Sequence, residues 1–127
     1  MGTGKSSIRG VYFVLQGAGV AVWWAVMFHH PSALWHFLPS NMPVEALTAF
    51  LPADVLFAAG SFVAAWLAFQ SHPGERLAAW FVAGAAFNAT LWCIGIWWLT
   101  GEAFAGVVCM LPCAVASVAC AVWASRS

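Results

Sequence analysis

Four long apolar runs, separated by short polar segments, restrict what this chain can fold into. They cover approximately residues 11–28, 43–70, 77–99 and 103–124, and a helix needs roughly 20 apolar residues to cross a bilayer. Only 6% of the 127 residues are charged, whereas a soluble domain carries about 25%. The sequence therefore predicts an all-α integral membrane protein, with one domain over residues 1–127 built as an up-down bundle of four transmembrane helices. Nothing in the sequence indicates nucleic-acid binding.

The positive charges lie on one side of this predicted topology. Lys5 and Arg9 precede the first span, Arg76 lies between the second and third, and Arg126 follows the fourth. Because cytoplasmic loops are enriched in Lys and Arg, both termini are predicted to be cytoplasmic. The loop at residues 29–42 and the turn near residues 101–102 then face outside. The first span lacks a cleavage signature, so we interpret it as a retained helix rather than a signal peptide.

Tryptophan placement supports the same topology, because indole rings favour the two membrane–water interfaces. One group falls at the predicted outer boundary and another at the inner one, namely Trp23, Trp24, Trp35, Trp97 and Trp98 outside, and Trp66, Trp80 and Trp123 inside. Trp92 falls within a span.

Three of the four histidines lie in the segment MFHHPSALWHFLP, residues 27–39, at the predicted outer face. His29 and His30, with Asp54 and Glu102 on the same side, are residue types that could bind a divalent metal or relay protons. Adjacent histidines point in different directions on a helix, however, and no His-x-x-x-His spacing occurs. We therefore predict no metal site and interpret the loop as an interfacial segment whose histidines meet water or headgroups. A metal or proton site is the alternative.

The spans also contain isolated polar residues, namely Gln16, Ser61 and Asn88. Asp54 lies in the outer third of the second span, two residues after Pro52. An ionised Asp is costly in a bilayer, so it should face protein or water rather than lipid. Pro52 cannot donate to the carbonyl of Thr48, which leaves an acceptor free nearby. We expect Asp54 to turn toward the first span or a partner chain and to accept a hydrogen bond.

Small residues recur at three- and four-residue steps on several spans, which lets helices pack closely in lipid. On the fourth span this face contains Gly106, Cys109, Cys113, Ala116 and Cys120. Comparable faces are Gly84, Asn88 and Gly95 on the third span, and Gly60, Ala64 and Ala68 on the second. Since Cys behaves as a small buried hydrophobe, we interpret Cys109, Cys113 and Cys120 as packing residues rather than a metal or redox site.

The segments RGVYFVLQGAGVAVWWAVMF and ADVLFAAGSFVAAW carry a further pattern. An Arg-x-x-Tyr-Phe-x-x-Gln run leads to a Trp-Trp pair, and the next span opens with Asp followed by Leu-Phe and Ser; the positions are Arg9, Tyr12, Phe13, Gln16, Trp23, Trp24, Asp54, Leu56, Phe57 and Ser61. This pattern resembles the membrane-embedded N-terminal half of some bacterial isoprenylcysteine carboxyl methyltransferase-like proteins. The resemblance implies a recurring four-helix membrane module. It does not imply methyl transfer, because that family binds the methyl donor in a C-terminal half beyond the matching spans.

Three classes of function remain. The first, which we favour, is a non-catalytic accessory subunit packed against partner subunits of a larger membrane complex. The second is a binding module or carrier for an apolar ligand such as a lipid, a quinone or a pigment. The third is a small membrane enzyme or transporter with an outer-face site at Asp54 and His29 or His30, although ion and proton paths usually need several polar groups in line. We expect a multi-pass protein of the bacterial inner membrane, surrounded by lipid and by partner subunits of a hetero-complex or a homo-oligomer.

A cysteine at position 32 tests this topology. Ser32→Cys, in a variant whose four native Cys are replaced by Ala, should react with a membrane-impermeant maleimide added to intact cells, since residues 29–42 are predicted to face outside. Labelling that requires the cytoplasmic face to be opened first would contradict the predicted orientation.

Overall fold

A computed structural model describes residues 3–127, and every regular element in that range is a helix. The elements are α1 (Thr3–His29), the 3₁₀ helix η1 (Pro31–His36), α2 (Val44–Thr48), α3 (Leu51–Phe69), α4 (Glu75–Thr100) and α5 (Phe104–Ser125). Four segments are long and apolar enough to cross a membrane, namely Gly4–His29, Val44–Phe69, Glu75–Thr100 and Phe104–Ser125. The predicted all-α bundle of four membrane spans is therefore confirmed.

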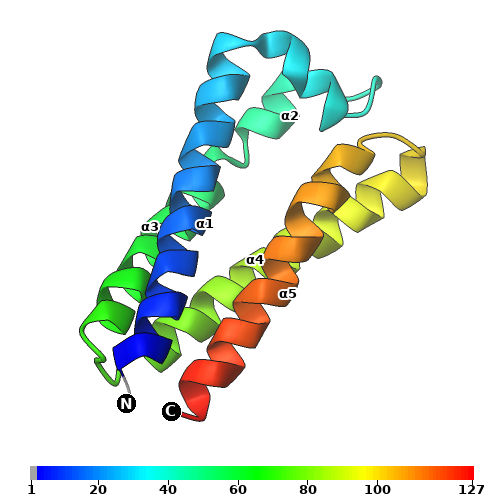
Figure 1. Cartoon of the computed structure of the whole chain (residues 1–127). Helices are drawn as coiled ribbons and strands as arrows, with labels where there is room; N and C mark the ends of the chain where they lie inside the picture. The colour runs from blue at the N-terminus through cyan, green and yellow to red at the C-terminus, as the bar shows by residue number, and fades with distance from the viewer. Residues whose placement is uncertain (1–2) are drawn as a thin grey trace.

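The four long helices form two hairpin-like pairs. Helix α1 packs along α3, α4 packs along α5, and α3 contacts α4 to join the two pairs. The pairs converge at the end that holds Thr3 and Ser127, which we call the terminal end, and diverge toward the other end, which we call the far end (Figure 1). The short helix η1 lies at the far end and contacts both α1 and α5.

Helix α1 begins earlier than the apolar pattern predicts. The apolar pattern predicts that the first span starts near residue 11, but the structure is helical from Thr3. The additional turns are polar and are held by contacts with other elements. The hydroxyl of Ser6 lies 3.3 Å from that of Ser71 in the α3–α4 loop, and Arg9 is buried. Hydropathy alone does not detect a helical end that is stabilised in this way.

The second span is divided, whereas the sequence predicts one run over residues 43–70. Helix α2 ends at Thr48 and α3 begins at Leu51, with Pro52 in the first turn of α3. Proline suits that position, because the N–H that it lacks would have no partner within the helix. The break also turns the chain, so that α2 lies beside η1 at the far end (Figure 1).

The interior is divided into two apolar clusters. The cluster toward the terminal end contains Phe13, Phe57 and many small side chains, among them Ala64, Ala83 and Ala114. The other cluster lies beneath η1 at the far end and contains Trp24, Met27, Leu34, Leu38 and Leu47. Alanine lets helix backbones approach closely, which favours association where lipid competes equally for apolar surface.

Two glycines of α1 lie where side chains of α3 approach its backbone closely. A Cβ atom at Gly10 would lie 2.7 Å from the Phe69 ring, and one at Gly17 would lie 2.9 Å from the Phe62 ring. Each phenylalanine therefore covers the backbone of α1 directly. Large apolar side chains elsewhere point outward, as at Leu77, Trp98 and Leu99, which suits a protein surrounded by lipid.

Candidate functional site

A buried ion pair joins α1 to α4 at the terminal end. Arg9 Nε donates to Glu75 Oε1, and Arg9 Nη2 donates to Glu75 Oε2 over 3.0 Å. The two residues are only 3% and 6% exposed. The Trp123 ring of α5 lies 5.3 Å from the guanidinium carbon of Arg9, and Nη1 of Arg9 lies 3.4 Å from the Ser127 hydroxyl. One side chain of α1 thus connects α1, α4 and the end of α5.

The sequence interpretation missed this ion pair. In the sequence, Arg9 serves as a positive charge that indicates topology and as one position of the resemblance pattern, and Glu75 is not among the candidate site residues. The structure instead places Arg9 inside the bundle, while Lys5, Arg76 and Arg126 are exposed. A usable signal was present, since Arg9 and Glu75 each stand beside the start of an apolar run at the same predicted end. Glu75 also lies in the first turn of α4, where the helix dipole favours a carboxylate.

Gln16 is the centre of a second polar cluster, about two helical turns further along α1. Its amide nitrogen donates to the Ser61 hydroxyl of α3 over 3.1 Å. Ser61 in turn donates to the carbonyl oxygen of Phe57. The amide oxygen of Gln16 accepts from the Ser117 hydroxyl of α5 over 2.8 Å and also from the Tyr12 hydroxyl. The same amide therefore connects α1, α3 and α5.

Tyr12 extends this cluster along α5. Its hydroxyl lies 3.1 Å from the carbonyl oxygen of Cys113 and 3.2 Å from the Ser117 hydroxyl. Pro112 lies one residue before Cys113 inside α5, and it cannot donate a backbone hydrogen bond. On the other side of Pro112, the carbonyl oxygen of Met110 accepts from Thr90 of α4 over 3.0 Å. Side chains from two helices thus bond to backbone oxygens around this proline.

These clusters form a closed hydrogen-bond network. Within residues 3–127, Trp23 Nε1 is the one buried side-chain nitrogen or oxygen that lacks a partner. Tyr12, Gln16, Ser61 and Ser117 are occupied by one another and by backbone carbonyls. Such an arrangement fixes the spacing of three helices.

At the far end, Asp54 lies against the first span, as the sequence analysis expects. Its Oδ2 accepts a hydrogen bond from Trp24 Nε1 over 2.7 Å. Trp24 is buried and stacks edge-on against Trp23. Glu102 does not take part in the Trp24–Asp54 contact. Its two carboxylate oxygens accept hydrogen bonds from Ser40, one from the backbone N–H and one from the hydroxyl. This contact joins the loop after η1 to the α4–α5 turn.

The residues proposed for an outer-face site are not brought together. His29, His30 and His36 are exposed, while the two acids bond to different partners. Across residues 3–127, no group of three or more His, Cys, Asp and Glu side chains has the arrangement needed to hold a metal ion.

The cysteine face of α5 is only partly buried within this chain. Cys113 and Cys120 are half-buried, and Cys120 packs against the larger apolar cluster, but Cys109 is exposed. Gly106 lies close to α4, because a Cβ atom there would lie 3.1 Å from Cys93 Sγ. The four cysteines are free thiols.

Among the polar residues predicted within the spans, Asn88 lies outside these hydrogen-bonded clusters. It lies near the middle of α4, its side chain is exposed, and it has no hydrogen-bond partner within the part of the chain that the structure describes. A Cβ atom at Gly84 or Gly95 on the same helix would have no neighbour within 4 Å. The face predicted from Gly84, Asn88 and Gly95 is therefore directed away from the bundle.

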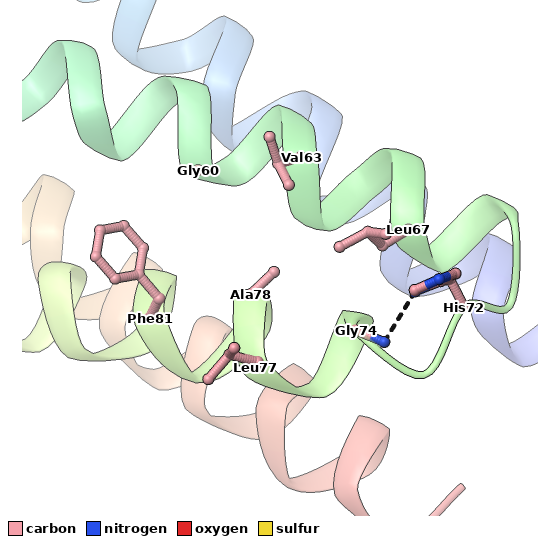
Figure 2. Close-up of a pocket in the computed structure, with 8 residues that line it drawn as sticks. All are labelled: Gly60, Val63, Leu67, His72, Gly74, Leu77, Ala78 and Phe81. Atoms are coloured by element: carbon pink, nitrogen blue, oxygen red, sulfur yellow. Dashed lines mark hydrogen bonds between the residues drawn. The ribbon is translucent and has the colours of Figure 1, made fainter.

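An apolar groove lies between α3 and α4. It has a volume of about 570 Å³ and is lined by Gly60, Val63, Leu67, His72, Gly74, Leu77, Ala78 and Phe81. Figure 2 shows Val63 and Leu67 of α3 directed toward Ala78 and Phe81 of α4. At the terminal end of the groove, His72 Nδ1 accepts a hydrogen bond from the Gly74 N–H over 3.0 Å. At its other end Phe81 lies close to Gly60.

Comparisons with protein-family models, with curated proteins and with solved structures find no match. The resemblance to the methyltransferase-like membrane module therefore stays a prediction.

The Arg9–Glu75 pair generates a stability prediction. Arg9→Leu leaves the Glu75 carboxylate buried without its partner, and the free energy of unfolding should fall by about 3–5 kcal/mol. The double variant Arg9→Leu/Glu75→Leu should recover most of this loss, because neither buried charge remains. Reversible unfolding in detergent measures both variants. Arg126→Leu, at an exposed arginine, is the control, and an Arg9→Leu effect as small as that of the control would contradict a structural ion pair.

The Trp24–Asp54 hydrogen bond generates a second stability prediction. Asp54→Asn retains an acceptor oxygen for the indole N–H and should change the unfolding free energy little. Asp54→Leu leaves that buried N–H unpaired and should cost about 1–3 kcal/mol. Trp24→Phe/Asp54→Leu, which removes both polar groups, separates the hydrogen bond from packing. Equal damage from Asn and Leu would instead indicate a role for the carboxylate charge.

Proposed function

We propose that this protein is a non-catalytic subunit of a larger membrane complex, and that it presents α4 to a partner within the bilayer. The observation that supports this most is the position of Asn88. Its amide lies near the middle of a membrane-spanning helix and is directed away from its own bundle. The bilayer core contains no water to satisfy a polar group, so a donor and acceptor there favour a protein partner.

The remainder of the α4 surface is consistent with helix packing. Gly84 lies about one turn from Asn88 toward the terminal end, and Gly95 about two turns toward the far end. Neither position is filled by the rest of the chain. Membrane helices associate through small residues and polar side chains. The small residues allow close backbone contact, and an intramembrane amide adds a hydrogen bond.

The interior supports a structural rather than a catalytic role. The buried polar side chains are engaged with one another, and the sequence-predicted acids and histidines do not converge. A third class, an enzyme or transporter that uses Asp54 with His29 or His30, has no comparable support. The location in a bacterial inner membrane rests on the charge distribution and on the family resemblance, and it is part of the proposal.

A second candidate function is the binding of an apolar ligand in the α3–α4 groove. The groove is lined mainly by aliphatic and aromatic side chains and runs from the α3–α4 loop to Phe81, in the second turn of α4 (Figure 2). Its volume lies within the range of small-molecule pockets, about 300–1,000 Å³. Its apolar lining suits a lipid acyl chain.

Site-specific photocrosslinking in native membranes tests the subunit proposal. A photoreactive amino acid at Leu91, one turn from Asn88 on the exposed side of α4, should give a discrete crosslinked protein. The same residue at Val115, which is exposed on α5, is the matched control and should react mainly with lipid. Mass spectrometry identifies the crosslinked species. The absence of protein crosslinks at Leu91, or an equal pattern at Val115, would refute a partner on α4.

Filling the groove tests the second candidate. Val63→Trp places a large side chain in the groove, whereas Val115→Trp adds the same volume to a comparably exposed position on α5. Native mass spectrometry should show less co-purified lipid for Val63→Trp than for the control. Equal lipid retention would indicate that the groove holds no specific ligand.

A further inference from the structure

We propose that the partner on α4 is a second copy of this chain, and that the two Asn88 amides hydrogen-bond to each other across a two-fold axis along the membrane normal. This inference rests on the proposed function, because it identifies the occupant of the same α4 surface.

The first argument is the spacing of the exposed residues on α4. Steps of four and three residues alternate along one line of the helix, through Leu77, Phe81, Gly84, Asn88, Leu91, Gly95 and Trp98. Six of these seven residues are exposed and Gly95 is partly exposed. An alternation of four and three is the heptad repeat, which keeps one seam facing a partner as two helices supercoil with left-handed twist. Most membrane helix bundles have this handedness. We call this line the α4 seam.

The second argument is that the bilayer fixes the relative orientation of two copies. Copies inserted with the same topology have parallel α4 helices, so a two-fold axis must run along the membrane normal. Under that symmetry each seam residue lies opposite the same residue at the same depth. Asn88 therefore meets Asn88, without any further adjustment of register.

The third argument is the complementarity of the amide with itself. Its nitrogen donates and its oxygen accepts, so two symmetry-related amides can satisfy each other with reciprocal hydrogen bonds. A buried Asn on the seam of a parallel coiled coil forms this pair and specifies a dimer in register. A different partner protein would need its own polar group at the depth of Asn88, whereas a second copy supplies one necessarily.

Gly84 and Gly95 fit the same geometry. They lie on either side of Asn88 along the seam, and both positions are open. Two glycines on a shared seam let the helix backbones approach closely enough for short amide side chains to meet. Leu77 and Phe81 continue the seam toward the terminal end and also line the α3–α4 groove. A lipid held in that groove would lie beside the dimer contact.

The test combines crosslinking with an association measurement on the full chain. Leu91→Cys, with the four native Cys replaced by Ala, should form a disulfide-linked dimer under mild oxidation in phosphatidylcholine vesicles. Val115→Cys is the control and should stay monomeric on a denaturing gel. Energy transfer between labelled copies in the same vesicles then gives the dimer dissociation constant for each Asn88 variant.

Asn88→Leu should raise the dimer dissociation constant roughly tenfold, since interhelical hydrogen bonds in membranes are individually weak. Gly84→Leu should raise it at least as much by holding the helices apart. Asn88→Gln, which keeps the amide, should retain most of the association. Asn88→Leu should leave unfolding of the monomer unchanged, because Asn88 has no partner within residues 3–127.

The outcomes distinguish this inference from the proposed function. If Leu91 crosslinks in native membranes to a different protein and Leu91→Cys forms no dimer, the dimer is refuted and the subunit proposal stands. If neither experiment gives a protein contact on α4, both fail. A dimer that persists with unchanged affinity in Asn88→Leu, or that is not captured by Leu91→Cys, would place the contact elsewhere and refute the α4 seam.

Discussion

The amide of Gln16 has no water to bond to inside the bilayer, so its partners must come from other helices, and this constraint organises the bundle. Gln16 bonds to Ser61 of α3 and to Ser117 of α5, and Tyr12 adds a contact to a backbone oxygen of α5. Each bond has a direction and a length, which apolar contacts lack. The interior of a membrane bundle gains little from the hydrophobic effect, because lipid is as apolar as leucine. The hydrogen bonds therefore specify which helix faces lie together.

The same constraint explains why the two hairpins converge where they do. Arg9, Tyr12 and Gln16 lie between the start and the midpoint of α1, and their contacts connect α1 to the other three long helices. Toward the far end, α1 contacts α3 through the Trp24–Asp54 bond and packs against η1 and α2 in the second apolar cluster. Aromatic contacts such as Phe50 with Trp92 join the pairs there instead. The polar contacts that connect α1 to all three other long helices thus lie in the part of the bundle where the two pairs converge (Figure 1).

The same constraint applies to the amide of Asn88, which has no hydrogen-bond partner within residues 3–127. The chain satisfies its other intramembrane amide internally and leaves this one facing out, on a line of α4 residues that includes two open glycines. An unpaired amide is a cost for an isolated bundle and a source of specificity for an assembly. The groove of Figure 2 shares Leu77 and Phe81 with that line, so lipid binding and helix pairing would act on adjoining parts of one surface.

The sequence by itself determined the number of spans and the class of fold, and it predicted that Asp54 faces protein or water rather than lipid, because apolar run length and the cost of a buried charge depend on local composition. It also identified Gln16, Ser61 and Asn88 as informative residues. It did not show that Gln16 bonds to Ser61 while Asn88 faces away from the bundle. Helix periodicity assigns residues to one face of a helix, but it does not identify the helix that this face contacts. The Arg9–Glu75 pair was missed for the same reason, since a basic residue before a span usually meets water. Only the tertiary structure, by bringing the start of α1 against the start of α4, decided that this one is buried.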